Sequence, residues 1–312
     1  MVMDEWQGKA YSAAFGSSHV HNGFDPRTFD IAMAGSPLQT RSLNLAIAGG
    51  SQSEQRVTAL EFLRHIQPPA KIGSPLEAKA CMVILELNAG ANFTNDHLVH
   101  PRAINIYDAE TARFIWRLTS PEMSLTQKVG RIGYSILAMA LHYTNVGMLS
   151  STVFAPPIDQ ASLDAETRDD RRGLLSMPTS TKAYMKLEEI VAAAPATSTG
   201  TPQELLPGNR DLLDELAAAS PVRNLQMAYI VMPKLSDMWG YPVTPTEIAW
   251  SDGMAPVVDM ARPDLYPELY QAKYWMDDAH LNERGAALMT RLVAENLKAW
   301  YAAHGEPARC GG

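Results

Sequence analysis

Two polar clusters near opposite ends of the chain carry a hydroxyl, a carboxylate and an imidazole. Gly16-Ser17-Ser18 follows a short apolar run, and Asp277 and His280 stand just before a helical pattern. Two residues separate the carboxylate from the imidazole, so a tight turn can bring both to one side. Asp277 could then hold the histidine tautomer while the free ring nitrogen of His280 removes a proton from a serine hydroxyl. This is the logic of a Ser-His-Asp triad, which geometry defines and chain order does not.

Each cluster also has a simpler interpretation. Gly-Ser-Ser occurs in many loops, where the glycine permits a sharp turn and the serines cap the next helix. Aspartate is likewise common at the start of a helix. Other polar blocks in a matching order are therefore needed before Ser18 is preferred as a nucleophile.

The histidines raise the alternative of a metal site. His19 and His21 form a His-x-His pair directly after Ser18, and His97 and His100 could be added to them. No acidic or cysteine ligand stands nearby at a suitable spacing, and a serine triad needs no metal. We therefore predict no metal and no other cofactor, and we interpret His19 and His21 as substrate contacts.

The elements that must position these residues begin with three apolar runs. Strands are expected over 11–15, 42–48 and 81–87, and apolar positions at helical spacing predict a helix over 52–66. Strands that alternate with helices are typical of a parallel sheet covered by helices, an α/β fold. Between the first two strands, a short helix or irregular segment is expected to cover the core with Phe29, Ile31 and Met33.

The same pattern resumes late in the chain. Strands are expected over 225–232 and 256–260, and an amphipathic helix from Leu281 onward. We interpret residues 1–312 as a single domain that carries an insertion at about 111–220.

The insertion itself is predicted to be mostly helical. Residues 111–150 favour one or two packed helices, and further helices are expected over 181–193 and 209–219. The charged residues of 164–172 are expected to form a solvated face. Long insertions at a sheet edge often shape access to a substrate site.

Three polar clusters follow predicted parallel strands directly. They are Ser17-Ser18, Gly49-Gly50-Ser51 and the segment from Asn88 to Asn92. Because the carboxyl ends of parallel strands meet at the ligand crevice of an open α/β sheet, we expect these clusters to converge.

Taken in order, these blocks resemble those of the SGNH (GDSL-like) hydrolases, over nearly the whole chain apart from the middle. The last block is the most specific, because ten residues from Asp277 follow the family's Asp-x-x-His-Leu-Asn-x-x-Gly pattern. The resemblance implies a three-layer α/β/α, flavodoxin-like fold with a central parallel sheet. It also implies that Ser18 is the nucleophile, His280 the general base, and Asp277 the acid that orients it. The four blocks are Gly16-Ser17-Ser18, Asn44-x-x-x-x-Gly49, Asn88 or Asn92, and Asp277-x-x-His280-Leu281-Asn282.

The resemblance further implies an oxyanion hole made by the backbone N–H groups of Ser18 and Gly49. The asparagine of the third block, Asn88 or Asn92, would add a side-chain donor. The sequence departs from the family in that block, which lacks Gly-x-Asn-Asp, and in Ser17, which replaces the usual aspartate.

The segment from Gly16 to Pro26 is similar to one branch of the family, associated with acylation of bacterial cell walls and exopolysaccharides. That branch includes relatives of the teichoic-acid D-alanyl transfer protein and of the alginate O-acetylation proteins. It implies an esterase or O-acyltransferase that acts through an acyl-enzyme on a small-molecule or polysaccharide ester, in the periplasm or cell envelope. The alternative is a non-catalytic carbohydrate-binding or scaffold protein that retains the fold.

Composition narrows the possible partners. A net charge of −8 argues against nucleic acid, whose binders need a basic face. No run approaches the roughly 18 apolar residues of a membrane span, and no basic-then-apolar signal peptide opens the sequence. We interpret Cys81 and Cys310 as two separate thiols.

Overall fold

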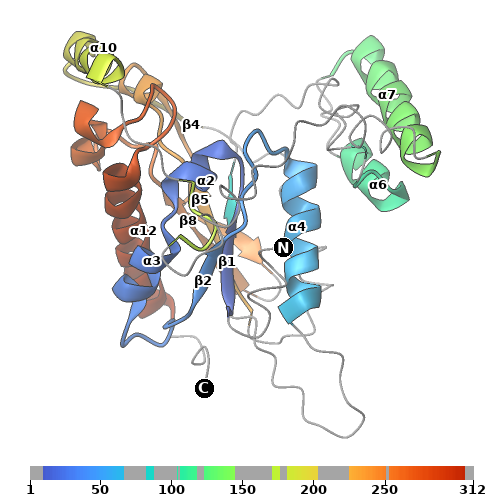
Figure 1. Ribbon diagram of the computed structural model, residues 1–312, viewed down its shortest axis with the longest axis horizontal. Helices are drawn as coiled ribbons and strands as arrows, with labels where there is room; N and C mark the ends of the chain where they lie inside the picture. The colour runs from blue at the N-terminus through green and yellow to red at the C-terminus, as the bar shows by residue number, and fades with distance from the viewer. Residues whose placement is uncertain are drawn as a thin grey trace, which may run out of the picture.

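A computed structural model describes residues 10–66, 82–87, 104, 106–117, 123–144, 171–175, 181–202, 225–250 and 253–305. Over these residues the fold is mixed α/β, with a mostly parallel central sheet (Figure 1). Its strands lie in the order β2-β1-β3-β5-β8-β7, and only β7 runs antiparallel to its neighbour. The strands are β1 (Ser12–Phe15), β2 (Ser42–Asn44), β3 (Met82–Glu86), β5 (Gln226–Val231), β7 (Glu247–Trp250) and β8 (Gly253–Asp259).

Helices cover both faces of this sheet (Figure 1). Alternate residues of a strand point to opposite faces, so Phe15 and Val83 pack on one side while Ala14 and Ile84 pack on the other. One face is covered by α4 (Gln52–Ile66). The other face is covered by α2 (Ser18–Gly23), α3 (Pro26–Met33) and α12 (Glu283–His304).

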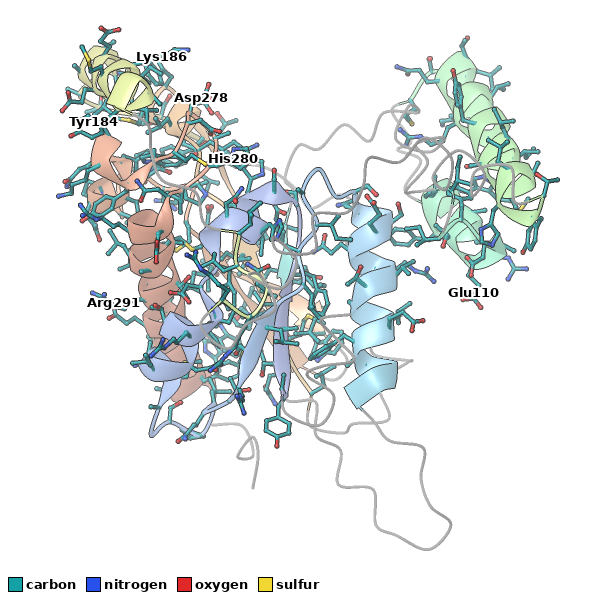
Figure 2. The ribbon with its side chains drawn as sticks, in the orientation of Figure 1. Glu110, Tyr184, Lys186, Asp278, His280 and Arg291 are labelled. Atoms are coloured by element: carbon teal, nitrogen blue, oxygen red, sulfur yellow. The ribbon has the colours of Figure 1, made fainter. Side chains whose placement is uncertain are left out.

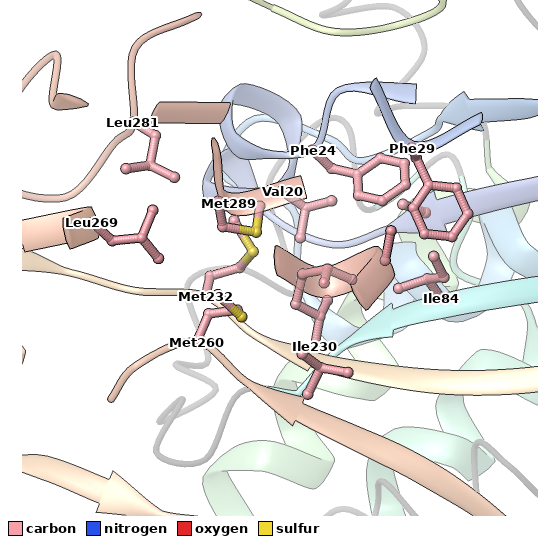
Figure 3. Packing of buried hydrophobic residues seen from close by; sticks show 14 of the residues in the cluster. Val20, Phe24, Phe29, Ile84, Ile230, Met232, Met260, Leu269, Leu281 and Met289 are labelled. Carbon is pink, nitrogen blue, oxygen red and sulfur yellow. The ribbon is translucent and has the colours of Figure 1, made fainter. Parts of the chain in front are cut away.

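The core on the α12 side holds α2 in place (Figure 3). Val20 of α2 is fully buried in a cluster that includes Met232, Leu281 and Met289. Gly23 allows this close approach, because a Cβ there would lie 3.4 Å from the terminal carbon of Met289 and closer still to that of Met232. The short helix after β1 is therefore fixed by packing on α12.

The inserted region is helical where it is described, with α6 (Ala109–Arg117), α7 (Leu125–Tyr143) and α10 (Thr181–Ala193). Figure 1 shows α6 and α7 lying together, far from α10. A small parallel pair joins β4 (Gly200–Pro202) to β6 (Tyr241–Val243). Short 3₁₀ helices occupy η2 (Leu235–Met238), η3 (Pro267–Tyr270) and η4 (Ala272–Tyr274).

The structure confirms the predicted strand–helix alternation and the helices over 52–66 and 181–193. It corrects the second strand, which ends at Asn44 and not at residue 48. Ile31 was wrongly assigned to the core and is 68% exposed. Because α3 is a regular helix, Phe29 and Met33 share its buried face and Ile31 points away. The helix predicted over 209–219 lies outside the described residues.

The described end of the charged run predicted over 164–172 differs from its prediction as a solvated face. Arg172 is buried and pairs with Asp30 of α3. The carbonyl of Arg172 accepts a hydrogen bond from the N–H of Asn44, and the N–H of Leu175 donates to the carbonyl of His21. The insertion therefore returns to the sheet beside β2 and α2.

Candidate active site

The turn between β1 and α2 lifts Ser18 to the end of the sheet. Gly16 is required here, because a Cβ at this position would lie 2.5 Å from a carboxylate oxygen of Glu86 and 2.6 Å from a methyl group of Val20. Ser17 is the N-cap of α2, and its hydroxyl accepts a hydrogen bond from the N–H of His19 at 3.3 Å. Ser18 is therefore the first residue of the helix, half-buried, with its hydroxyl near the carboxyl ends of the strands.

His280, which Figure 2 shows close to Asp278, contacts Ser18 from near the other end of the chain. Its Nε2 lies 2.8 Å from the Oγ of Ser18, a hydrogen-bond distance between residues 262 positions apart. The loop that carries His280 is tied down on both sides. The N–H of Met276 donates to the carbonyl of His280 at 2.8 Å, and a β-bridge joins Trp275 to Leu281.

Asp277 contacts the other nitrogen of the imidazole, the Nδ1 of His280. Both carboxylate oxygens of Asp277 lie 3.0 Å from the Nδ1 of His280. One of them also accepts hydrogen bonds from the N–H groups of Ala279, at 2.8 Å, and His280, at 2.7 Å. The Asp-x-x-His spacing thus closes a turn in which the carboxylate of Asp277 contacts the imidazole of His280, and the imidazole contacts the hydroxyl of Ser18.

The electrostatics of this turn keep Asp277 ionised. Burial alone would raise the pKa of Asp277, but the hydrogen bonds from Ala279 and from the ring and N–H of His280 hold it below its usual value. An ionised carboxylate can only accept, so Nδ1 of His280 carries the ring proton that it binds. Nε2 is then left as the acceptor that faces the hydroxyl of Ser18.

The predicted oxyanion glycine lies in a turn next to the nucleophile turn. Gly49 has a φ of 66°, which glycine adopts without strain. Its neighbours touch Gly16: the N–H of Ile47 donates to the carbonyl of Gly16 at 2.9 Å, and a Cβ on Gly50 would lie 3.2 Å from the same oxygen. The structure thus brings the Gly49 turn alongside the Ser17-Ser18 turn. Asn88 and Asn92 lie outside the described residues.

His19 and His21, both predicted as substrate contacts, have different surroundings. The ring of His19 stacks on that of His280, with centroids 5.1 Å apart and planes 15° from parallel. His21 instead forms a hydrogen bond with the backbone of Gly173, while burial lowers its pKa. Only His19 is part of the cluster around Ser18 and His280.

Glu86 is a polar residue at this site that the sequence reasoning missed. It is the last residue of β3, is 5% exposed, and accepts hydrogen bonds from both the N–H and the hydroxyl of Ser17. The signal was present, because Glu86 is the one charged residue in the apolar run 81–87. A carboxylate is rarely buried without a partner, so its position in a core strand marks a specific contact.

Asn44, from the second block, holds the far end of α2. Its side-chain amide donates to the carbonyls of Val20 and Phe24, both at 2.8 Å, and its oxygen accepts from the N–H of Ala46 at 3.2 Å. Asn44 therefore ties the end of the nucleophile helix to β2.

Within the described part of the chain, no group of three or more histidine, cysteine or acidic side chains is arranged to hold a metal ion. His97, His100 and both cysteines lie outside it. No helix of the described residues is long and apolar enough to cross a bilayer.

Comparisons of the chain with protein-family models, with curated proteins and with solved structures gave no match.

Proposed function

We propose that this protein is a serine hydrolase of the SGNH type, an esterase or O-acyltransferase that works through an acyl-enzyme. The observation that carries the proposal is the 2.8 Å contact between the Oγ of Ser18 and the Nε2 of His280. Asp277 completes the arrangement from the opposite side of the ring. A hydroxyl, a neutral imidazole acceptor and an ionised carboxylate in this order are what nucleophilic activation of a serine requires.

In the proposed reaction, the Oγ of Ser18 attacks the ester carbonyl carbon as its proton passes to the Nε2 of His280. The tetrahedral intermediate collapses when the alcohol oxygen leaves with the proton that His280 returns to it. A second hydroxyl then attacks the acyl-enzyme as its proton passes to His280. His280 returns that proton to the Oγ of Ser18 as the bond between Ser18 and the acyl group breaks. Water as the second hydroxyl gives hydrolysis, and a sugar hydroxyl gives transfer. Asp277 stabilises the imidazolium that forms in each half-reaction.

The oxyanion of each intermediate needs donors beside Ser18. We assign this role to the backbone N–H groups of Ser18 and Gly49, with Asn88 or Asn92 as the side-chain donor. The turn that contains Gly49 contacts Gly16, which supports the assignment.

The order of the strands in the central sheet also supports the proposal. Numbered along the chain, the parallel strands β1, β2, β3, β5 and β8 have the spatial order 2-1-3-4-5, which the flavodoxin-like class of doubly wound folds shares. In that class the ligand site lies at the carboxyl ends of the strands, next to the point where the order reverses. Ser18 follows β1, the strand on which the reversal turns.

For the substrate, we propose an acylated or acetylated carbohydrate, met outside the cytoplasm. The basis is the similarity of the segment from Gly16 to Pro26 to the branch that acylates cell-wall and exopolysaccharide sugars. The exposed part of the His19 ring, beside His280, is the group we assign to contact the sugar.

The test is esterase activity together with labelling by a fluorophosphonate, which reacts only with an activated serine. Wild-type protein should hydrolyse p-nitrophenyl acetate and acquire one label, and Ser18→Ala should lose both. Ser36→Ala is the matched control, because Ser36 is a half-buried serine that bonds only within its own turn, to the carbonyl of Met33. Equal turnover by wild type and Ser18→Ala would overturn the nucleophile. Absence of both signals from the wild type would favour the carbohydrate-binding scaffold.

A further inference from the structure

A buried carboxylate lies directly beneath the nucleophile turn. Glu86 stands at the end of β3, the strand next to β1, and its side chain is 3% exposed. One of its oxygens accepts the backbone N–H of Ser17, and the other accepts the hydroxyl of Ser17 at 3.0 Å. Both donors of Ser17 are thus directed at a single carboxylate, and charge-assisted bonds of this kind are among the strongest in proteins.

Counting hydrogens extends this contact to His19. A serine hydroxyl has one hydrogen, and that of Ser17 goes to Glu86. The Oγ of Ser17 lies 2.9 Å from the Nδ1 of His19, so in this contact the oxygen accepts and the ring nitrogen donates. Glu86 therefore sets the tautomer and the orientation of His19 through Ser17, just as Asp277 sets those of His280.

His19 in turn contacts the base. The two imidazoles lie nearly parallel, 15° apart with centroids at 5.1 Å, so the His19 ring covers one face of His280. A ring covered on one face and hydrogen-bonded at both nitrogens keeps its orientation between Asp277 and Ser18.

The frame around Glu86 is itself fixed. The side-chain amide of Gln55, on α4, donates to the carbonyls of Phe15 and Glu86, each at 3.2 Å. It therefore bridges the ends of β1 and β3, between which the carboxylate of Glu86 meets Ser17. Gln55, Phe15 and Glu86 are all distinct from Ser18, His280 and Asp277.

We propose that Glu86 is a positioning residue for the reaction at Ser18. It fixes the backbone that presents the Ser18 hydroxyl, and through Ser17 and His19 it holds the ring of His280. The role rests on the proposed function, since only a reacting Ser18 gives it a catalytic consequence. Within the described residues the side chain of Glu86 contacts Ser17 and, at 3.6 Å, the Nδ1 of His19, and it contacts neither Ser18 nor His280. It therefore acts through Ser17 and His19.

The decisive variant is Glu86→Gln, which keeps the size of the side chain and removes its charge. One of the two Ser17 donors then meets an NH₂ group in place of an acceptor. We expect kcat for p-nitrophenyl acetate to fall roughly 10- to 100-fold with KM within about twofold, and the rate of fluorophosphonate labelling to fall in parallel. Asp108→Asn is the control, because Asp108 is a half-buried carboxylate that accepts the N–H of Thr111 at the start of α6. It should leave both rates unchanged.

A second readout separates positioning from a loss of folding. Nitrogen NMR of the histidine rings in the wild type should show the Nδ1 of His19 protonated. This signal should change in Glu86→Gln and in Ser17→Ala, which removes the hydroxyl that joins Glu86 to His19 but keeps the backbone bond to Glu86 and the longer Glu86–His19 contact of 3.6 Å. Ser17→Ala also serves if Glu86→Gln does not fold.

The outcomes are distinct. A kcat for Glu86→Gln within twofold of wild type, or a His19 signal unchanged in either variant, overturns the role of Glu86. If the wild type neither turns over ester nor labels, the proposed function fails. The His19 signal then still decides whether Glu86 orients that ring.

Discussion

At the level of single residues, the proposed proton path depends on which nitrogen of His280 carries hydrogen. Asp277 decides this, because its ionised carboxylate receives the Nδ1 hydrogen and leaves Nε2 free for Ser18. The hydrogen bonds that lower the pKa of Asp277 keep it ionised over the range in which a histidine base works.

The first prediction follows from this tautomer. Asp277→Asn can keep one oxygen for the N–H groups of Ala279 and His280, but its NH₂ group favours the wrong tautomer of His280. We expect kcat to fall about 10³- to 10⁴-fold with little change in KM, as measured with p-nitrophenyl acetate. Asp278→Asn is the matched control, because Asp278 is exposed and its carbonyl, not its carboxylate, bonds Leu235. A loss below tenfold in Asp277→Asn contradicts the assigned role.

The sequence indicated Ser18, Asp277 and His280, but it did not indicate Glu86, which holds Ser17 in place. Asp277 and His280 share one turn, so their contact is local and follows from spacing. Glu86 meets Ser17 across 69 positions, and only the pairing of β1 with β3 brings them together. Such a contact depends on which strands are neighbours, and periodicity in one chain does not determine that.

Among the elements, the turn from β1 to α2 leaves no room for a side chain at Gly16. Gly16 packs against Glu86 and Val20 at distances that no Cβ tolerates. Gly133, on the exposed side of α7, has nothing within 4 Å of an added Cβ. These two glycines therefore form a natural pair for substitution.

The second prediction uses this pair. Gly16→Ala should displace the turn, destabilise the fold by about 1–3 kcal/mol and abolish most labelling of Ser18. Gly133→Ala should instead stabilise the protein by up to ~1 kcal/mol with unchanged labelling, because alanine is the better helix former. Urea unfolding and fluorophosphonate labelling measure both effects. Wild-type labelling of Gly16→Ala would show that the turn is looser than its packing indicates.

The third prediction concerns the link between α2 and β2. Asn44→Ala leaves the carbonyls of Val20 and Phe24 and the N–H of Ala46 without their buried partner, so we expect a loss of roughly 1–3 kcal/mol. Asn296→Ala is the comparison, because the half-buried amide of Asn296 donates to Leu292 in its own helix and accepts one bond, from the hydroxyl of Tyr266. Chemical unfolding should show the larger loss for Asn44, and equal losses would argue against the link.

The strands could be predicted from the sequence where consecutive residues are all buried. The apolar runs of β1, β3 and β5 are typical of buried parallel strands and were placed to within one or two residues. The edge strand β7 was not predicted, because it is short and only partly buried, and its pairing with β8 stabilises it. β4 and β6 were missed for the same reason: each has three residues and needs the other.

At the scale of the whole molecule, stability should respond to pH through a carboxylate behind the His280 loop. Burial raises the pKa of Asp237 to about 6, against the hydrogen bonds it receives from Lys234 and Tyr270. The folded state therefore holds an extra proton between about pH 4 and 6, and stability falls as the pH rises through that interval. A shift of about two units corresponds to roughly 3 kcal/mol.

The fourth prediction is that Asp237→Asn removes this loss. The variant should be more stable than wild type at pH 7.5, by up to about 3 kcal/mol, and the gain should vanish near pH 4. Urea unfolding at the two pH values measures it. Asp264→Asn should behave in the opposite way, because the bond from Arg262 holds the pKa of Asp264 at about 2 and its ionised form stabilises the fold. A gain for Asp237→Asn that is equal at both pH values would contradict the assignment.

The whole-molecule arrangement was predictable only in outline. Alternation of strands and helices indicated a helix-covered parallel sheet, and the mixed α/β structure confirms that class. The sequence did not indicate where the insertion returns. Arg172 reads as part of a charged surface run, and only its pairing with Asp30 buries it beside α3.

The distance along the chain between Ser18 and His280 has a consequence for how the protein becomes active. The proposed nucleophile, Ser18, directly follows the first strand, and the proposed base, His280, comes 262 residues later, on the loop that enters α12. At about 5–20 residues per second, a ribosome needs roughly 13–52 s to make the intervening chain. If His280 activates Ser18 as proposed, Ser18 stays an ordinary, unreactive hydroxyl during synthesis until α12 docks on α2 and α3. The time course of Ser18 labelling would then report when α12 of a newly made or refolding chain packs against α2 and α3.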